Sequence, residues 1–228
     1  MSNITLITEM AEALKPLLHK VVFVGGCVVE LLVDDKASAN IRITKDVDIV
    51  AEISTRGAYY SLLNELKTLG FKHNMPIDEP SPICRLIYKG MLLDVMPTDE
   101  SVLGFSNRWY LPALENTRAV ELGNGLSINM IASVYFIATK LVAFRSRGQS
   151  DLYCHDMEDI ITVYNGNTNI VAEIQNADAD VKRFIKDEFE TLLTGKSFRI
   201  NCIAGHLGRT ESPGRIEVVY RRIVDSIS

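Results

Sequence analysis

Residues 45–50 read KDVDIV. The alternation of polar and apolar residues predicts a β-strand, in which side chains two residues apart lie on one face. Asp46 and Asp48 would then share a face while Val47 and Ile49 pack into the core. Asp is a poor strand former, and two adjacent carboxylates repel each other unless a cation lies between them. The pattern favours a Mg²⁺ site built from oxygen ligands; the alternative is an exposed strand face that tolerates aspartate.

A glycine pair follows an earlier β-rich run. Residues 21–26 read VVFVGG, and a helix is expected from Cys27 to about Val33. Glycines at a strand-to-helix turn let backbone N–H groups approach a phosphate, and a helix N-terminus favours the anion. A tight turn needs glycine in any case, so Gly25-Gly26 fits both a phosphate site and a purely structural turn.

A third carboxylate, Asp94, lies in the apolar run LLDVM. Residues 84–88 and 91–95 are expected to form a hairpin around Lys89-Gly90. If the strand of Asp94 lies beside that of Asp46, the sheet gathers three carboxylates, which is the ligand set that two-metal phosphoryl-type transfer requires. Taken alone, Asp94 would be interpreted as a surface group on an edge strand.

The remaining periodicity divides the chain into a mixed half and a helical half. Amphipathic helices are expected over residues 4–18 and about 58–69, on either side of the first two strands. Beyond about residue 127 the pattern becomes helical, with helices expected at about 128–147, 150–164, 178–193 and 212–227. The predicted fold class is α/β, of the α+β kind: a mixed-sheet catalytic core over residues 1–125, followed by a helical bundle over residues 126–228.

Composition excludes several classes of protein. The 228 residues are 47% hydrophobic and 23% charged with a net charge of −5, which is typical of a globular chain and argues against disorder or general DNA binding. Only residues 182–228 carry a basic excess, +3 from nine basic and six acidic residues. Four cysteines without CxxC spacing indicate free thiols. With no signal peptide and no apolar run of membrane length, a cytoplasmic protein without a membrane partner is expected.

Taken together, these motifs resemble a known enzyme superfamily. The order Gly-Gly, helix, Asp-x-Asp and later strand Asp is similar to the DNA polymerase β-like nucleotidyltransferases. Residues 139–148, TKLVAFRSRG, and 155–160, HDMEDI, resemble the AbiEii/AbiGii type nucleotidyltransferase toxins, which include the mycobacterial MenT toxins. Residues 94–98, DVMPT, and 105–110, FSNRWY, are also similar to that group. The resemblance covers about residues 20–165.

The resemblance implies roles for the residues of the first half. Gly25 and Gly26 would hold the triphosphate of a nucleoside triphosphate (NTP). Asp46 and Asp48 would bind two Mg²⁺ ions, or Mn²⁺ in their place. Asp94 would complete the metal site and help to deprotonate the acceptor hydroxyl.

In the second half, the resemblance implies that Lys140 neutralises triphosphate charge and that an acidic residue on the following helix contributes, Asp159 first and Asp156 second. The helical pattern places Lys140 at the edge of the buried side of its helix. Two other basic residues are candidate phosphate contacts with ordinary alternatives. Lys45 flanks the aspartate pair, and Arg147 stands at a helix C-terminus, where arginine is favoured by the helix dipole alone.

The expected activity is transfer of a nucleoside monophosphate from an NTP to a hydroxyl, with release of pyrophosphate. The resemblance implies an RNA acceptor, such as the 3′ end of a tRNA, and a toxin that has a cognate antitoxin protein. Two alternatives stay open. In the first, the chemistry is the same but the acceptor is a protein or a small molecule such as an antibiotic. In the second, the chain is a nucleotide-binding module without turnover.

Overall fold

The computed structural model describes residues 2–35, 41–74, 81–123, 125–146, 151–195, 198–207 and 213–228. They divide into two units. The first comprises Met1–Val28 and Ile43–Ala132, and the second comprises Val29–Arg42 and Ser133–Ser228. The expected boundary between residues 125 and 126 thus differs from the observed division, which keeps the strand after residue 125 in the first unit and assigns residues 29–42 to the second.

The first unit is built on a mixed seven-stranded sheet with the order β3-β4-β5-β2-β1-β7-β6. Its strands are β1 (Val21–Val24), β2 (Asp46–Ala51), β3 (Lys72–His73), β4 (Arg85–Tyr88), β5 (Met91–Pro97), β6 (Thr117–Gly123) and β7 (Leu126–Ile131). β2 pairs in parallel with β5 and antiparallel with β1, which in turn pairs in parallel with β7. With the helices of both units, this sheet confirms the predicted α/β fold class.

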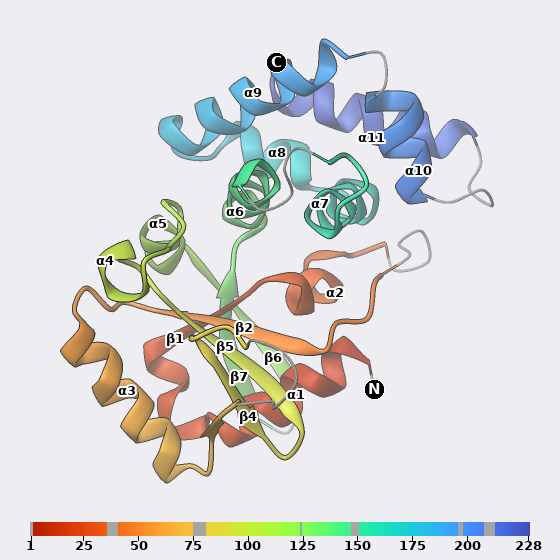
Figure 1. The fold of residues 1–228 in the computed structure, drawn as a ribbon. Helices are drawn as coiled ribbons and strands as arrows, with labels where there is room; N and C mark the ends of the chain where they lie inside the picture. The colour runs from red at the N-terminus through yellow and green to blue at the C-terminus, as the bar shows by residue number, and fades with distance from the viewer. Residues whose placement is uncertain are drawn as a thin grey trace. The chain divides into compact units, whose positions relative to one another are not determined.

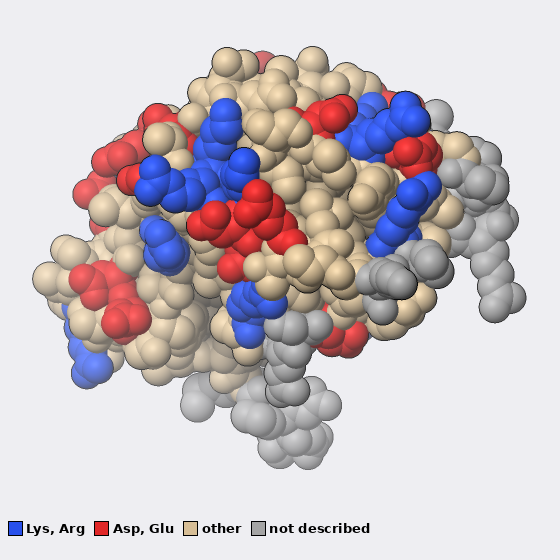
Figure 2. All heavy atoms as spheres, turned by 90° about the horizontal axis from the view of Figure 1, so that it is seen from above, with Lys and Arg blue, Asp and Glu red and all other residues tan. Residues whose placement is uncertain are grey.

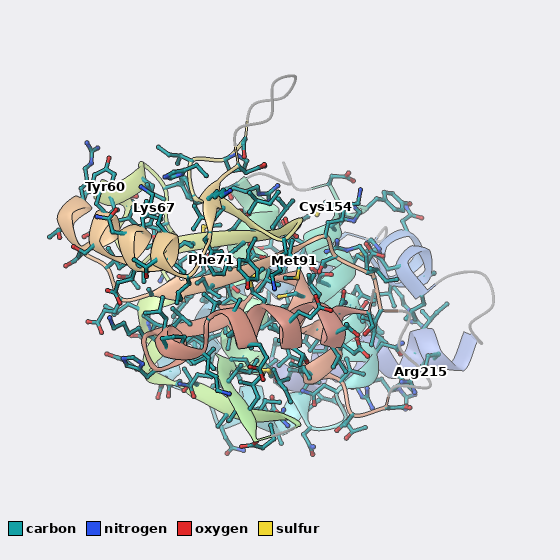
Figure 3. All side chains as sticks on the ribbon, turned by 90° about the horizontal axis from the view of Figure 1, so that it is seen from below. Tyr60, Lys67, Phe71, Met91, Cys154 and Arg215 are labelled. Carbon is teal, nitrogen blue, oxygen red and sulfur yellow. The ribbon has the colours of Figure 1, made fainter. Side chains whose placement is uncertain are left out.

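Short helices pack around this sheet. They are α1 (Asn3–Ala13), the 3₁₀ helices η1 (Lys15–Lys20) and η2 (Gly26–Val28), α3 (Arg56–Thr68), α4 (Glu100–Leu103) and α5 (Tyr110–Glu115). α1 begins where the Ser2 hydroxyl accepts from the Thr5 N–H at 3.1 Å. It ends earlier than the expected residue 18, because Pro16 cannot continue an α-helix and lies in η1 instead. After α3, Phe71, which is labelled in Figure 3, stacks on Tyr88 of β4 with ring centroids 4.8 Å apart.

The hairpin of β4 and β5 forms where the sequence predicted it. Lys89 and Gly90 have φ values of 48° and 84°, the left-handed pair that a two-residue hairpin turn requires. The turn fixes the register, so that Tyr88 lies opposite Met91 and Arg85 lies opposite Asp94. This register brings two opposite charges together.

The helix expected over residues 128–147 is wrong in its first part. Residues 126–131 form β7, which makes a hairpin with β6, and helix α6 begins only at Ser133 (Ser133–Ser146). Leu126, Ile128 and Met130 are buried, while Ser127 and Asn129 between them are partly exposed. This period of two is that of a strand, and the apolar residues on its buried face extend the helical pattern of α6 backwards in the sequence.

The second unit is helical (Figure 1). After α6, it contains α7 (His155–Gly166), α8 (Ile170–Gln175), α9 (Ala179–Leu193), the π-helical segment η3 (Phe198–Ile203), α10 (Ala204–Leu207) and α11 (Pro213–Ser226), together with the short α2 (Val29–Leu32). Its core includes Phe189, whose ring packs edge-on against two other rings. The ring centroids are 5.4 Å apart for Tyr164 and 6.3 Å apart for Phe198. Burial of such rings supplies much of the stability of a small helical unit.

The carboxyl end of α7 is held by groups from two distant segments. Arg222 of α11 donates to the carbonyls of Tyr164 and Asn165 at 2.8 and 2.7 Å. The backbone N–H groups of Asp34 and Asp35 donate to the Gly166 carbonyl at 3.2 and 2.9 Å. These bonds satisfy carbonyls that a helix end leaves unpaired, and they attach residues 29–42 to the helical unit. Within the described residues, none of the helices combines the length and the apolarity needed to cross a bilayer.

Candidate functional site

The two strands that carry the aspartates are neighbours, as expected from the sequence. Asp48 of β2 lies opposite Asp94 of β5 in the parallel pair. Asp46 lies two residues earlier on β2 and therefore on the same face. The sheet thus brings all three carboxylates together near the amino-terminal end of β2.

A fourth charged side chain, Arg85 of β4, lies among the carboxylates. Its Nε donates to Asp94 Oδ1 at 2.7 Å, and its Nη2 donates to Asp94 Oδ2 at 2.6 Å and to Asp46 Oδ2 at 2.7 Å. The two bonds to Asp94 form the forked geometry that makes arginine–carboxylate pairs strong. The hydrogen bonds to Asp94 outweigh the opposing effect of burial and raise the pKa of Arg85 above its ordinary value.

Sequence reasoning did not single out Arg85, although the signal was present. A two-residue turn at Lys89-Gly90 pairs residues that lie at equal distances from it, and Arg85 and Asp94 are such a pair. An arginine opposite an aspartate on one face of a hairpin predicts an ion pair. Arg85 is therefore a site residue that register, rather than a local motif, identifies.

The carboxylates differ in their access to solvent. The side chain of Asp94 is 7% exposed, whereas that of Asp46 is 34% exposed. One nitrogen of Arg85 contacts both, so Asp46 Oδ2 and Asp94 Oδ2 lie within two hydrogen-bond lengths of each other. A single cation can contact both oxygens, and an incoming ligand can reach them from the side of Asp46.

The donor set fits a hard divalent cation, because Mg²⁺ and Mn²⁺ take carboxylate oxygens. Among the residues that the structure describes, no group of three or more His, Cys, Asp or Glu side chains is already placed to hold a metal ion. The guanidinium of Arg85 contacts both Asp46 and Asp94. The carboxylate chemistry of these residues fits a metal.

Gly25 brings backbone against the Asp48 carboxylate. Its φ is +74°, and a Cβ at this position would lie 1.9 Å from Asp48 Oδ2. Only glycine satisfies both conditions. The turn is closed by the Cys27 thiol, which donates to the Val24 carbonyl at 3.2 Å. Gly25 is thus required by this close approach, which goes beyond the needs of a tight turn.

The helix expected after the glycines is shorter than predicted. Gly26 begins the three-residue 3₁₀ helix η2, and α2 that follows has four residues. A helix of one turn has little macrodipole, so any phosphate binding here depends on backbone N–H groups rather than on a helix terminus. Lys45, which precedes Asp46, is exposed to solvent.

Two buried protonated groups flank the carboxylates. Burial, with a smaller contribution from Asp94, raises the pKa of the Cys84 thiol to about 12. Burial also raises the pKa of Tyr59, whose hydroxyl donates to the Val95 carbonyl at 3.2 Å. Both groups therefore stay neutral at physiological pH.

The second unit contains its own charged cluster. Lys140 Nζ lies 3.0 Å from Asp156 Oδ1 and 2.7 Å from Asp159 Oδ2. Arg42 Nη2 lies 3.2 and 3.1 Å from the two Asp159 oxygens. Burial of the Lys140 ammonium opposes its charge, but Asp159 and Asp156 outweigh burial and raise the pKa of Lys140. The expectation that Asp156 and Asp159 share a helix face agrees with their common contact to Lys140.

Lys140 is more deeply buried than its expected place at the edge of α6. It is 6% exposed, because α6 is packed on nearly all sides and its buried positions run continuously from Val134 to Ala138. Its ammonium also lies 5.8 Å from the centre of the Phe136 ring. In this state the positive charge is neutralised by Asp156 and Asp159. Arg147, the other basic candidate of this region, lies outside the described residues.

Several basic residues of the C-terminal segment 182–228 are paired with acids. Lys186 pairs with Glu190, Arg215 with Asp35, and both Arg199 and Arg221 with Glu217. Figure 2 shows basic and acidic side chains intermixed on the face that it draws. The basic excess of residues 182–228 is therefore not displayed there as one unbroken positive surface.

Comparison with known proteins supports the fold. No protein-family model matches the sequence, and no curated protein matches it. A solved structure described as an antigenic nucleotidyltransferase-like protein from Paracoccidioides brasiliensis matches at a TM-score of 0.52 and 17% identity, over 89% of this chain and 92% of that one. A putative nucleotidyltransferase from H. pylori aligns at a TM-score of 0.48 and 14% identity, over 98% and 91% of the two chains. At such identities the likeness concerns architecture, and the chain has the fold of a nucleotidyltransferase-like protein.

Proposed function

We propose that this protein is a metal-dependent nucleotidyltransferase that moves a nucleoside monophosphate from an NTP to a hydroxyl of an RNA acceptor, such as a tRNA 3′ end. The observation that carries the proposal is the meeting of Asp46, Asp48 and Asp94 on neighbouring strands, with the Gly25 backbone against one of them. The nucleotidyltransferase-like fold supports the same chemistry.

The two glycines and the three aspartates of the candidate site in the first unit each have a chemical task in this reaction. The N–H groups of Gly25 and Gly26 bind phosphate oxygens. Asp46 and Asp48 would hold Mg²⁺, which would neutralise the triphosphate and lower the pKa of the acceptor hydroxyl. Asp94 would complete the metal site and help to accept the proton of that hydroxyl. The acceptor oxygen then forms a bond to the α-phosphorus, and the bond to the bridging oxygen breaks and releases pyrophosphate.

The acceptor and the biological role rest on the resemblance to the AbiEii/AbiGii group. That resemblance favours RNA as the acceptor and a toxin function balanced by an antitoxin protein. It also assigns neutralisation of the triphosphate to Lys140, with Asp159 or Asp156 assisting. Because Lys140 is held by both aspartates, that task requires at least one of these ion pairs to be exchanged for phosphate.

A labelling assay tests the proposal. The protein is incubated with each α-³²P NTP, Mg²⁺ and total RNA, beside an Asp46→Asn/Asp48→Asn variant. Asp180→Asn serves as the matched control, since it makes the same chemical change at an exposed position on α9. Label in a discrete RNA band that the double variant loses and the control keeps would support the proposal. Label on protein alone would move the acceptor to a polypeptide.

One observation favours a second candidate, a nucleotide-binding module without turnover. Arg85 neutralises part of the charge of the aspartates, so their clustering does not by itself require a metal. This candidate predicts NTP binding without release of pyrophosphate from the NTP, whichever acceptor is present. Equilibrium dialysis with labelled NTP, run beside the transfer assay, separates the two candidates.

A further inference from the structure

Arg85 occupies the position of a cation shared by two of the site's carboxylates. We propose that its guanidinium is a built-in counter-ion that competes with the divalent metal, so that a metal bridging Asp46 and Asp94 enters only when Arg85 turns away. The inference rests on the proposed metal-dependent function and adds a residue that sets the metal affinity of the site.

The contacts of Arg85 are those of a bound cation. It uses both oxygens of Asp94 and one oxygen of Asp46, at 2.6 to 2.7 Å. A metal that bridges the same two carboxylates needs oxygens that Arg85 already holds. Two cations on one pair of carboxylates also repel each other, most strongly where water is excluded. Binding of the metal and binding of the guanidinium are therefore alternatives.

Burial gives this competition its strength. The side chain of Asp94 is 7% exposed, and a buried carboxylate without a partner is strongly destabilising. Arg85 supplies that partner in the metal-free protein. Its own side chain is 21% exposed, so it has a path toward solvent. Released in the presence of an NTP, the guanidinium can bind phosphate oxygens in the same forked manner.

The position of Arg85 on a separate strand makes the competitor removable without altering the ligands. Asp46 and Asp94 lie on β2 and β5, whereas Arg85 lies on β4. A substitution of Arg85 therefore leaves all three carboxylates in the chain. The two possible roles of Arg85 make opposite predictions. If Arg85 is purely structural, its loss disorders the site and weakens metal binding. If Arg85 competes with the metal, its loss strengthens metal binding.

Mn²⁺ binding, followed by electron paramagnetic resonance of the free ion, tests the proposal. The proteins are the wild type, Arg85→Gln, Arg85→Lys and, as control, Arg118→Gln, which removes the same charge from an exposed position on β6. Hydrogen bonds to charged groups have strengths that correspond to about a tenfold to hundredfold change in affinity. Arg85→Gln should bind Mn²⁺ tighter by about that factor, Arg85→Lys by less because lysine loses the fork, and Arg118→Gln should match the wild type.

Mn²⁺ affinity in Arg85→Gln that is equal to or weaker than that of Arg118→Gln would overturn the proposal while leaving the metal site in place. Absence of Mn²⁺ binding in all four proteins at millimolar ion would overturn the proposed metal site itself. Circular dichroism monitors the fold of each variant. If Arg85→Gln does not fold, Arg85→Lys decides: binding tighter than wild type supports the competition, and equal or weaker binding contradicts it.

Discussion

Substitution of Gly25 by alanine is expected to disable the site through a single methyl group. The new Cβ would lie 1.9 Å from Asp48 Oδ2, whereas ordinary carbon–oxygen contacts are about 3.3 Å or longer. The Asp48 carboxylate or the Gly25 turn must therefore shift by about 1.4 Å. A displacement of that size in a reacting constellation lowers the rate on the order of 10²-fold.

Backbone strain adds a separate effect on stability. Gly25 has a φ of +74°, and a left-handed conformation costs an L-residue about 1–2 kcal/mol. Gly104 is the matched control, because its φ is +84° and a Cβ there meets nothing within 4 Å. Gly104→Ala should lose only the strain energy, which lowers the melting temperature by about 2–4 °C per kcal/mol in a chain of this size.

The two variants are compared by thermal unfolding and by initial rates of nucleotide transfer with the acceptor found in the labelling assay. Gly25→Ala should melt below Gly104→Ala and should lose about 10²-fold more activity. The reasoning is refuted if the two variants have the same melting temperature and the same rate, because the contact with Asp48 would then have no consequence.

The other two predictions concern buried charges and buried thiols. Lys140→Met leaves Asp156 buried beside an apolar side chain, while Asp159 keeps its contact with Arg42; the change should lower the free energy of unfolding by about 3–5 kcal/mol. Lys186→Met, at an exposed i,i+4 pair, should change that free energy by about 0.5 kcal/mol. Equal losses in thermal unfolding would contradict the role of the buried cluster. Burial raises the pKa of Cys84 and of Cys202 to about 12 from an ordinary value of 9.0. Between pH 9 and pH 12 the folded protein therefore holds protons that the unfolded chain releases, so the free energy of unfolding falls as the pH rises. The urea midpoint should therefore drop between pH 8 and pH 10.5 by more in the wild type than in a Cys84→Ala/Cys202→Ala variant, and an equal drop in both would show that these thiols are not responsible.

Local patterns predicted the elements that depend on local chemistry. The strand at Asp46 and the hairpin at Lys89-Gly90 follow from alternation and from turn residues, and both are present. The β6–β7 hairpin was not predicted because Ile128 and Ile131 continue the helical spacing of α6 across Ser133. Whether these residues form a strand or a helix depends on their pairing with β6 and β1, and a short stretch of sequence does not contain this information.

The candidate site divides in the same way. The three aspartates could be found from sequence, because an aspartate in an apolar strand is unusual in itself. An arginine at the start of a strand, such as Arg85, is not unusual in itself. Only its position opposite Asp94 in the hairpin identifies it as a residue of the site. The depth of Lys140 was also missed, since the number of helices packed around α6 is a property of the tertiary fold rather than of α6.

The assignment of residues 29–42 to the helical unit has a consequence for the protein during its synthesis. These residues emerge from the ribosome between two parts of the sheet, yet Arg42 pairs with Asp159, which is 117 positions later in the chain. Domains tend to fold as units while translation proceeds. Asp34, Asp35 and Arg42 are therefore synthesised well before their partners in α7, and these contacts can form only after α7 has been made. A chain that ends near residue 132 would lack the α7 partners of Asp34, Asp35 and Arg42, and a fragment starting at residue 133 would lack Arg42 and the Asp34 and Asp35 N–H groups that bond to Gly166. The two units are separable by their contacts, but no single cut in the chain separates them.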